Sequence, residues 1–210
     1  MMNPARPALV IAVLCSLLLP VRVAALAPLD SLGVWVQRVA ARNAMAHDVA
    51  AYKFVAGRPI EDPQREAAVL AEKRDQAVQR GVDPDAVVHT YRQLIEANKL
   101  LQHADFQRFL LGRTPSPPPS LDAIRERIDT LDERLLSQWA QLDDVRAAPD
   151  CSRQLARAIA RQGTPGAPLD DATRIALVRA TLGFCPHDGV PAGGVAGGVA
   201  GAAQNDAAGH

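Results

Sequence analysis

The chain has 210 residues, of which 48% are hydrophobic and 22% are charged, a composition that suits a globular domain with one core. Lys and Arg number 23, as do Asp and Glu, and the resulting net charge of zero argues against a nucleic-acid binder, which normally carries a basic excess. Aromatic residues make up 4%, too few for base-stacking platforms, while frequent alanines and scarce β-branched runs favour an all-α fold over a β-rich one.

The first 27 residues have the layout of a secretory signal peptide. Arg6 provides a positive charge, residues 8–20 form an apolar run, and small residues precede two candidate cleavage points, after Ala27 or after Ala25. The run is shorter than the roughly 18–20 apolar residues that span a membrane, which disfavours the alternative of a transmembrane anchor. We therefore expect an exported protein, periplasmic or secreted, with no stable membrane association once residues 1–27 are removed.

Helix signals follow one another along the rest of the chain. Asp62-Pro63 and Asp83-Pro84 each place an N-capping acid before a proline at the first helical position, and Gly81 stands where the intervening helix should end. Residues 112–119 have the Pro-rich composition of a stiff linker. These signals and the hydrophobic periodicity predict helices over residues 32–55, 62–80, 83–111 and 120–146, a short helix from residue 149, and a last helix over residues 170–184.

The predicted helices make up one all-α domain over residues 28–187, a bundle of about six helices. Residues 188–210 contain little besides Gly, Ala and Val, and we expect them to form a disordered tail.

Export changes the interpretation of the cysteines. Cys15 lies in the signal peptide, so the mature chain keeps Cys151 and Cys185. In an oxidising compartment two cysteines are most simply a disulfide, and two buried free thiols are the alternative.

The sequence lacks the common motifs for metal, nucleotide and covalent chemistry. The five histidines include no pair four residues apart with acidic support, and neither a CxxC nor a GxSxG motif occurs. The glycines of the tail lack the preceding strand and following helix of a phosphate loop. We therefore expect no metal and no cofactor.

Cations and amides share helical faces in the predicted helices. Arg42 and Lys53 are eleven residues apart, which at 100° per residue brings them to within about 20° of one another on one helix. Asn98 and Gln102 are four residues apart and hence neighbours on another helix, and Arg134 lies on the fourth. Each of these groups has an ordinary interpretation as a surface residue. The spacing alone therefore indicates no more than an α-helical protein in which an anion pocket is one hypothesis.

The start of the second predicted helix adds three polar residues. Asp62 has a full structural explanation as a helix cap, and Arg65 and Glu66 follow in the first turn.

Five stretches of the sequence contain the residues discussed above or flank them: VAAYKF at residues 49–54, PIEDPQRE at 59–66, Asp83-Pro84, QLIEANKLLQ at 93–102 and IDTLDERLL at 128–136. In order and spacing these stretches resemble the exported, all-helical chorismate mutases. The resemblance covers about residues 32–186 and leaves out the tail. The resemblance also places a disulfide at Cys151 and Cys185.

The resemblance implies a Claisen rearrangement of chorismate, a small dicarboxylate, to prephenate, within a pocket formed by one chain. The reaction breaks an ether C–O bond and forms a C–C bond without moving a proton, so it needs no metal and no acid or base. The enzyme has to hold the compact conformer and to stabilise the negative charge that grows on the ether oxygen.

Roles for eight residues follow from the same resemblance. Lys53 and Gln102 are expected to donate hydrogen bonds to the ether oxygen. Arg42 and Arg134 are expected to clamp carboxylate, with Arg65 at a second carboxylate region. The remaining three are expected to bind substrate: Glu66 and the Asp62 backbone at the ring hydroxyl, and Asn98 at a carboxylate.

Two alternatives remain open at this level. One is an isochorismate pyruvate-lyase on the same fold, and the other is a helical dicarboxylate-binding protein without turnover. Relatives of the exported subclass often dimerise, so a homodimer is possible, but the sequence does not indicate which faces would pair.

Gln102 yields a prediction about pH. Some relatives have Glu at this position, which donates a hydrogen bond only when it is protonated. Because a Gln amide donates at any pH, we expect little loss of chorismate turnover between mildly acidic and neutral conditions. Initial rates across this range test the expectation. A steep fall above about pH 6, as a protonated carboxyl with a raised pKa requires, would argue against Gln102 as the donor.

Overall fold

The computed structural model describes residues 30–117, 120–163 and 168–186. The predicted signal peptide and the predicted tail both lie outside these residues. Within them, all regular structure is helical, which confirms the all-α prediction. None of the described helices is both long enough and apolar enough to cross a membrane.

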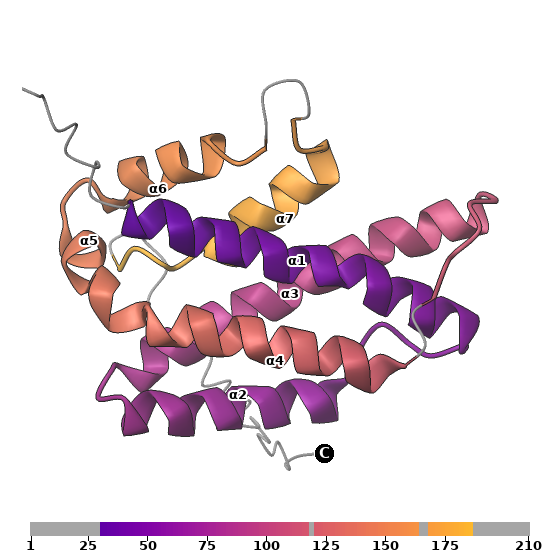
Figure 1. Ribbon diagram of the computed structural model, residues 1–210, viewed down its shortest axis with the longest axis horizontal. Coiled ribbons are helices and arrows are strands. Elements are labelled where there is room, and N and C mark those ends of the chain that lie inside the picture. The colour runs from indigo at the N-terminus through magenta and orange to yellow at the C-terminus, as the bar shows by residue number, and fades with distance from the viewer. Residues whose placement is uncertain (1–29, 118–119, 164–167, 187–210) are drawn as a thin grey trace, which may run out of the picture.

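Seven α-helices and one short 3-10 helix, η1, make up the described part of the chain (Figure 1). They are α1 (Ser31–Val55), α2 (Pro63–Gln79), α3 (Pro84–Leu110), α4 (Leu121–Ser137), η1 (Trp139–Leu142), α5 (Asp143–Ala147), α6 (Cys151–Ala160) and α7 (Asp171–Thr181).

The capping side chains that the sequence indicates do begin these helices. Asp62 Oδ1 accepts a hydrogen bond from the Arg65 amide at 3.2 Å, and Asp83 Oδ1 accepts one from the Asp85 amide at 2.9 Å. Ser120 caps α4 in the same way. Each cap satisfies an amide at a helix start that has no partner within the helix.

The predicted helix over residues 120–146 is wrong in its length, because the structure divides it into α4, η1 and α5. Gln138 lies at the break, where its side chain accepts a hydrogen bond from Arg38 and donates one to the Ser31 carbonyl, each at 2.6 Å. Trp139 and Leu142 turn into the core just after it. Tertiary contacts, rather than a Gly or Pro, therefore end α4.

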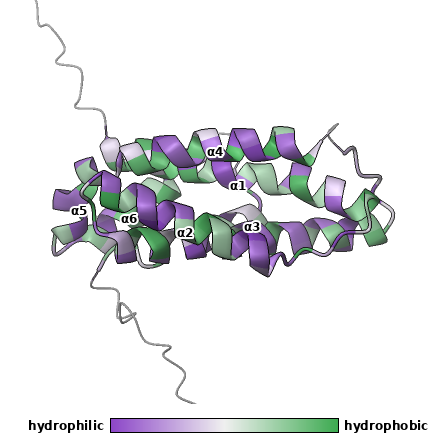
Figure 2. Cartoon of the chain, turned by 90° about the horizontal axis from the view of Figure 1, so that it is seen from below, coloured by the Kyte–Doolittle hydropathy of each residue, from purple (hydrophilic) through white to green (hydrophobic). Residues whose placement is uncertain are grey.

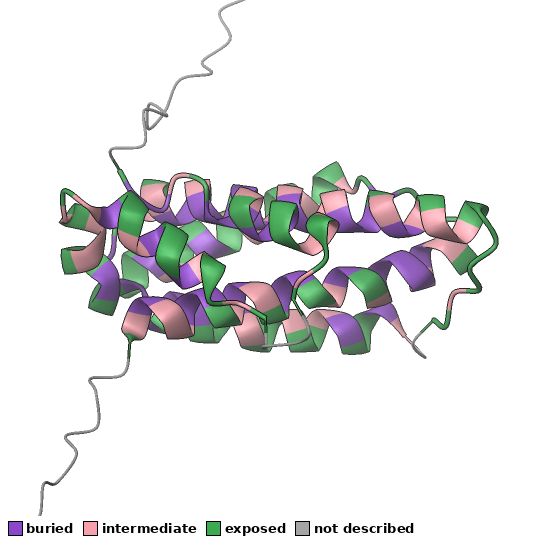
Figure 3. Cartoon of the chain, turned by 90° about the horizontal axis from the view of Figure 1, so that it is seen from above, coloured by how far each residue is buried: buried purple, intermediate pink, exposed green. Residues whose placement is uncertain are grey.

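Helix α1 is the central element of an elongated bundle. It packs against α3, α4 and α7, and α2 packs on the outer side of α3. The helices carry both hydrophobic and hydrophilic residues along their length (Figure 2). The buried residues face inward between the helices (Figure 3).

Large side chains and the disulfide close one end of the bundle. The Trp35 ring lies 4.6 Å from the Phe184 ring and 6.2 Å from the Trp139 ring, centroid to centroid. The disulfide between Cys151 and Cys185 joins the first residue of α6 to the segment after α7, which confirms the predicted pairing. This end holds the large aromatic side chains of the core.

We expect loss of the disulfide to lower the free energy of unfolding by about 3–4 kcal/mol, because the bond closes a loop of 34 residues in the unfolded chain. Urea unfolding with and without a reductant measures the difference. A variant with Ser at both Cys151 and Cys185 is the control, since reductant should leave its unfolding curve unchanged. Equal stability of the oxidised and reduced chains would contradict the expectation.

Candidate active site

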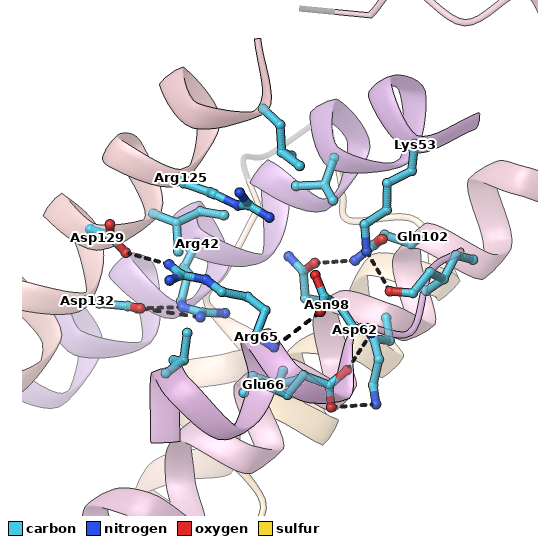
Figure 4. A pocket seen from close by; sticks show the side chains of 17 residues that line it. Arg42, Lys53, Asp62, Arg65, Glu66, Asn98, Gln102, Arg125, Asp129 and Asp132 are labelled. Atoms are coloured by element: carbon cyan, nitrogen blue, oxygen red, sulfur yellow. Dashed lines mark hydrogen bonds and ion pairs between the residues drawn. The ribbon is translucent and has the colours of Figure 1, made fainter. Parts of the chain in front are cut away.

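A pocket opens between α1, α2, α3 and α4 (Figure 4). With its open mouth and the solvent space there included, it encloses about 770 Å³. Seven of the eight residues predicted to bind substrate line it, and these are Arg42, Lys53, Asp62, Arg65, Glu66, Asn98 and Gln102. Residues from three helices and the segment before α2 therefore meet at one pocket.

Arg42 lies at the floor of the pocket in a buried ion pair. Its Nε is 2.5 Å from Asp132 Oδ1 and its Nη2 is 3.4 Å from Asp132 Oδ2, while Nη1 donates to the Leu94 carbonyl at 3.4 Å. Burial acts to lower the pKa of the Arg42 guanidinium, but the charge of Asp132 and its hydrogen bond outweigh burial and raise this pKa. Arg42 is a permanent cation in a fixed orientation.

Lys53 extends from the same face of α1 toward the start of α2. Its Nζ donates to the Ile60 carbonyl at 2.5 Å, and the side chain is buried. Burial lowers the pKa of the Lys53 ammonium below that of an ordinary lysine, although the charges of Asp62, Glu61 and Glu66 oppose the shift. An ammonium with one fixed hydrogen bond keeps two N–H groups for a ligand.

Asn98 and Gln102 form a buried amide pair on α3. Gln102 Nε2 donates to Asn98 Oδ1 at 2.7 Å. Asn98 Nδ2 and Gln102 Oε1 have no hydrogen-bond partner in the structure, and both side chains line the pocket. A buried polar atom without a partner is costly, so a polar ligand that bonds to it is favoured.

The first turn of α2 forms another wall of the pocket. The Asp62 amide donates to Glu66 Oε1 at 3.4 Å, and Glu66 Oε2 lies 3.2 Å from Lys99 Nζ. Lys99 also pairs with Glu96 at 2.7 Å. Burial lowers the pKa of Lys99, but its hydrogen bonds to Glu96 and Glu66 outweigh burial and raise it overall.

The expectation that Arg134 clamps a carboxylate has to be corrected. Arg134 is exposed on α4 and does not line the pocket. Arg125 does line it. The two residues are nine positions apart, and at 100° per residue this separation places them on opposite faces of the helix.

Four further charged residues line the pocket and were not predicted from the sequence: Lys99, Arg125, Asp129 and Asp132. Helical periodicity could have found two of them, since Leu121, Arg125, Ile128 and Asp132 recur at the spacing of one helical face. No signal in the sequence marks Asp132 as the partner of Arg42, which is 90 residues away.

The balance of charge in the pocket favours an anionic ligand. The cations are Arg42, Lys53, Arg65, Lys99 and Arg125, and the acids are Asp62, Glu66, Asp129 and Asp132. Two of the acids belong to close pairs with cations, namely Asp132 with Arg42 and Glu66 with Lys99. In the part of the chain that the structure describes, no three His, Cys, Asp or Glu side chains are grouped to hold a metal ion.

Fold and site together define an all-helical protein with a pocket between its helices that is rich in charged side chains. The family model "Chorismate mutase type II" matches residues 35–103. The chain is 35% identical over 152 residues to a secreted chorismate mutase of Mycobacterium tuberculosis, which covers 71% of this chain and 76% of that protein. For a secreted chorismate mutase of Mycolicibacterium smegmatis, the identity is 34% over 152 residues, with coverage of 71% and 83%.

Solved structures agree with these relatives. The chorismate mutase of Burkholderia thailandensis superposes with a TM-score of 0.69 at 34% identity, over 74% of this chain and 99% of that one. The chorismate mutase of Burkholderia phymatum gives a TM-score of 0.69 at 30% identity, over 74% and 96%. The chain therefore belongs to the all-helical chorismate mutase family, and its secreted relatives support the prediction of export.

The pKa values of Lys53 and Lys99 should be shifted in opposite directions from that of an ordinary lysine, downward for Lys53 and upward for Lys99. Lys53 is buried with a carbonyl as its hydrogen-bond partner, whereas Lys99 has two carboxylate partners. We expect an NMR titration of the lysine side chains to give Lys53 the lower pKa of the two. Glu96→Gln is the control, since removing this carboxylate partner should lower the pKa of Lys99. A pKa of Lys53 at or above that of Lys99 would refute the assignment.

Proposed function

We propose that the pocket between α1 and α4 binds chorismate and rearranges it to prephenate by conformer selection and electrostatic stabilisation. The observation that carries the proposal is the convergence of Arg42, Lys53 and Gln102 on one pocket with buried polar atoms that lack partners. These groups bind and orient anions, and the rearrangement requires nothing else.

Carboxylate binding is assigned to the arginines. Arg42 and Arg125 clamp carboxylate, with Arg65 at a second carboxylate region, so Arg125 takes the role that the sequence suggested for Arg134. The planar guanidinium forms two parallel hydrogen bonds to a carboxylate, which fixes orientation as well as position. Holding both carboxylates keeps the substrate compact and removes much of the entropic barrier.

The role of stabilising the negative charge that develops on the ether oxygen is assigned to Lys53 and Gln102. Both side chains are buried, and both keep an N–H group beyond the hydrogen bond they already donate. Donors held in place in a water-poor pocket stabilise a developing negative charge without reorganising. No group has to accept or release a proton.

The remaining lining residues orient the substrate. Glu66 and the Asp62 backbone are placed to bind the ring hydroxyl, and the unpaired Asn98 Nδ2 can donate to a carboxylate. Lys99 holds Glu66 in position.

We propose that the mature protein begins at Pro28 and carries one catalytic domain to residue 187. The pocket residues described here all come from one chain, so a homodimer, if it forms, is not needed to complete the site.

The proposal is tested by following the loss of chorismate absorbance with the purified mature chain, without added metal or nucleotide, and by identifying the product. Prephenate as product supports the assignment. A parallel assay with isochorismate distinguishes a chorismate mutase from an isochorismate pyruvate-lyase, because the lyase would release pyruvate from isochorismate. A folded chain that binds chorismate without converting either substrate would be a dicarboxylate-binding protein.

A matched pair of variants tests the site. We expect Arg125→Ala to lower kcat/KM about 100-fold, because a charged group in contact with the reacting anion is lost. Arg134→Ala removes an exposed arginine from the opposite face of the same helix and should change kcat/KM by no more than about twofold. A larger loss of kcat/KM in Arg134→Ala than in Arg125→Ala would assign the carboxylate clamp to Arg134 and not to Arg125.

A further inference from the structure

Asp132 is the buried carboxylate that pairs with Arg42 at the floor of the pocket. Its side chain is 1% exposed and that of Arg42 is 5% exposed, so the carboxylate is almost wholly covered. The backbone at the same position is also fixed, because the Tyr91 hydroxyl donates to the Asp132 carbonyl at 2.8 Å. Asp132 is therefore a rigid anchor on α4 for a side chain of α1.

The hydrogen bonds of Arg42 use three of the N–H groups of its guanidinium. A guanidinium has five N–H groups. Nε and one N–H of Nη2 point to Asp132, and one N–H of Nη1 points to the Leu94 carbonyl. The two that remain belong to Nη1 and Nη2. These two nitrogens form the end of the fork, the edge that binds a carboxylate through two parallel bonds.

We infer that Asp132 is a positioning residue, which holds the guanidinium of Arg42 so that its free edge meets a substrate carboxylate. This inference rests on the proposed function, because it assumes that Arg42 binds substrate. Asp132 also lines the pocket, but both of its carboxylate oxygens are bonded to Arg42, so it acts through Arg42. It restricts the rotation of a long side chain before binding, which reduces the entropy lost when the carboxylate docks.

Asp129, one turn earlier on α4, provides a comparison within the same pocket. It also pairs with a lining arginine, but Asp129 Oδ1 is 3.9 Å from Arg65 Nη2, and the two side chains are 52% and 40% exposed. A long, solvated ion pair holds its partner weakly. Two aspartates on one helix thus differ in how firmly they fix an arginine.

The test is the kinetics of Asp132→Asn and Asp129→Asn beside the unchanged enzyme. We expect Asp132→Asn to raise KM for chorismate about 10- to 100-fold while kcat changes little, since a misplaced clamp weakens binding. Asp129→Asn should raise KM no more than about threefold. If Asp132 were only structural, its loss would lower the fraction of active enzyme, and hence the apparent kcat, at unchanged KM; that result would overturn the inference.

A double-mutant cycle shows whether Asp132 acts through Arg42. In an Arg42→Lys background the fork is absent, so adding Asp132→Asn should change KM by less than about twofold. An equal effect of Asp132→Asn in both backgrounds would refute the link. If Asp132→Asn does not fold, Asp132→Glu keeps the charge but shifts the carboxylate. Its KM should rise, and an unchanged KM would refute positioning.

Failure of the proposed function gives a different result, since the unchanged enzyme would then not convert chorismate. In that case the affinity for prephenate, measured by calorimetry, reports how well Arg42 binds a carboxylate in the absence of turnover. Weaker binding in Asp132→Asn supports the positioning role, and equal binding overturns it.

Discussion

The constraint on which this structure depends is the burial of two cations on one helix. Arg42 and Lys53 project from the same face of α1 into a region that water reaches poorly, and each needs a partner there. Asp132 on α4 supplies one partner, and the Ile60 carbonyl before α2 supplies the other. Meeting these two needs places α4 and the start of α2 beside α1, and the space between them is the pocket.

The chemistry of the family explains why such a pocket suffices. A rearrangement without proton transfer requires fixed cations and hydrogen-bond donors, not a residue with a pKa tuned for acid or base work. The pocket contains more cations than acids, and its amide pair offers unpaired polar atoms. Preorganisation is therefore the property that the surrounding helices must supply.

Stability and recognition are concentrated in different parts of the bundle. Trp35, Trp139 and Phe184 pack at one end beside the disulfide, where large rings are buried against one another although the two indole N–H groups have no hydrogen-bond partner. The pocket lies farther along α1, where polar groups are buried without full pairing, an arrangement that costs stability. Burial of the large rings at the aromatic end offsets such costs, and the disulfide ties α6 to the segment after α7.

The sequence by itself determined the helical class and the caps that begin the helices, because local signals encode them. The seven predicted residues that line the pocket came from the resemblance to the family, since their spacing alone indicated only shared helical faces. Only the tertiary structure decided where α4 ends and which of its faces meets the pocket. Those features depend on contacts such as Gln138 with Ser31 and Asp132 with Arg42, which join residues about a hundred positions apart. Such pairings are selected by packing and by the cost of burying an unpaired charge, and neither is visible in a local pattern.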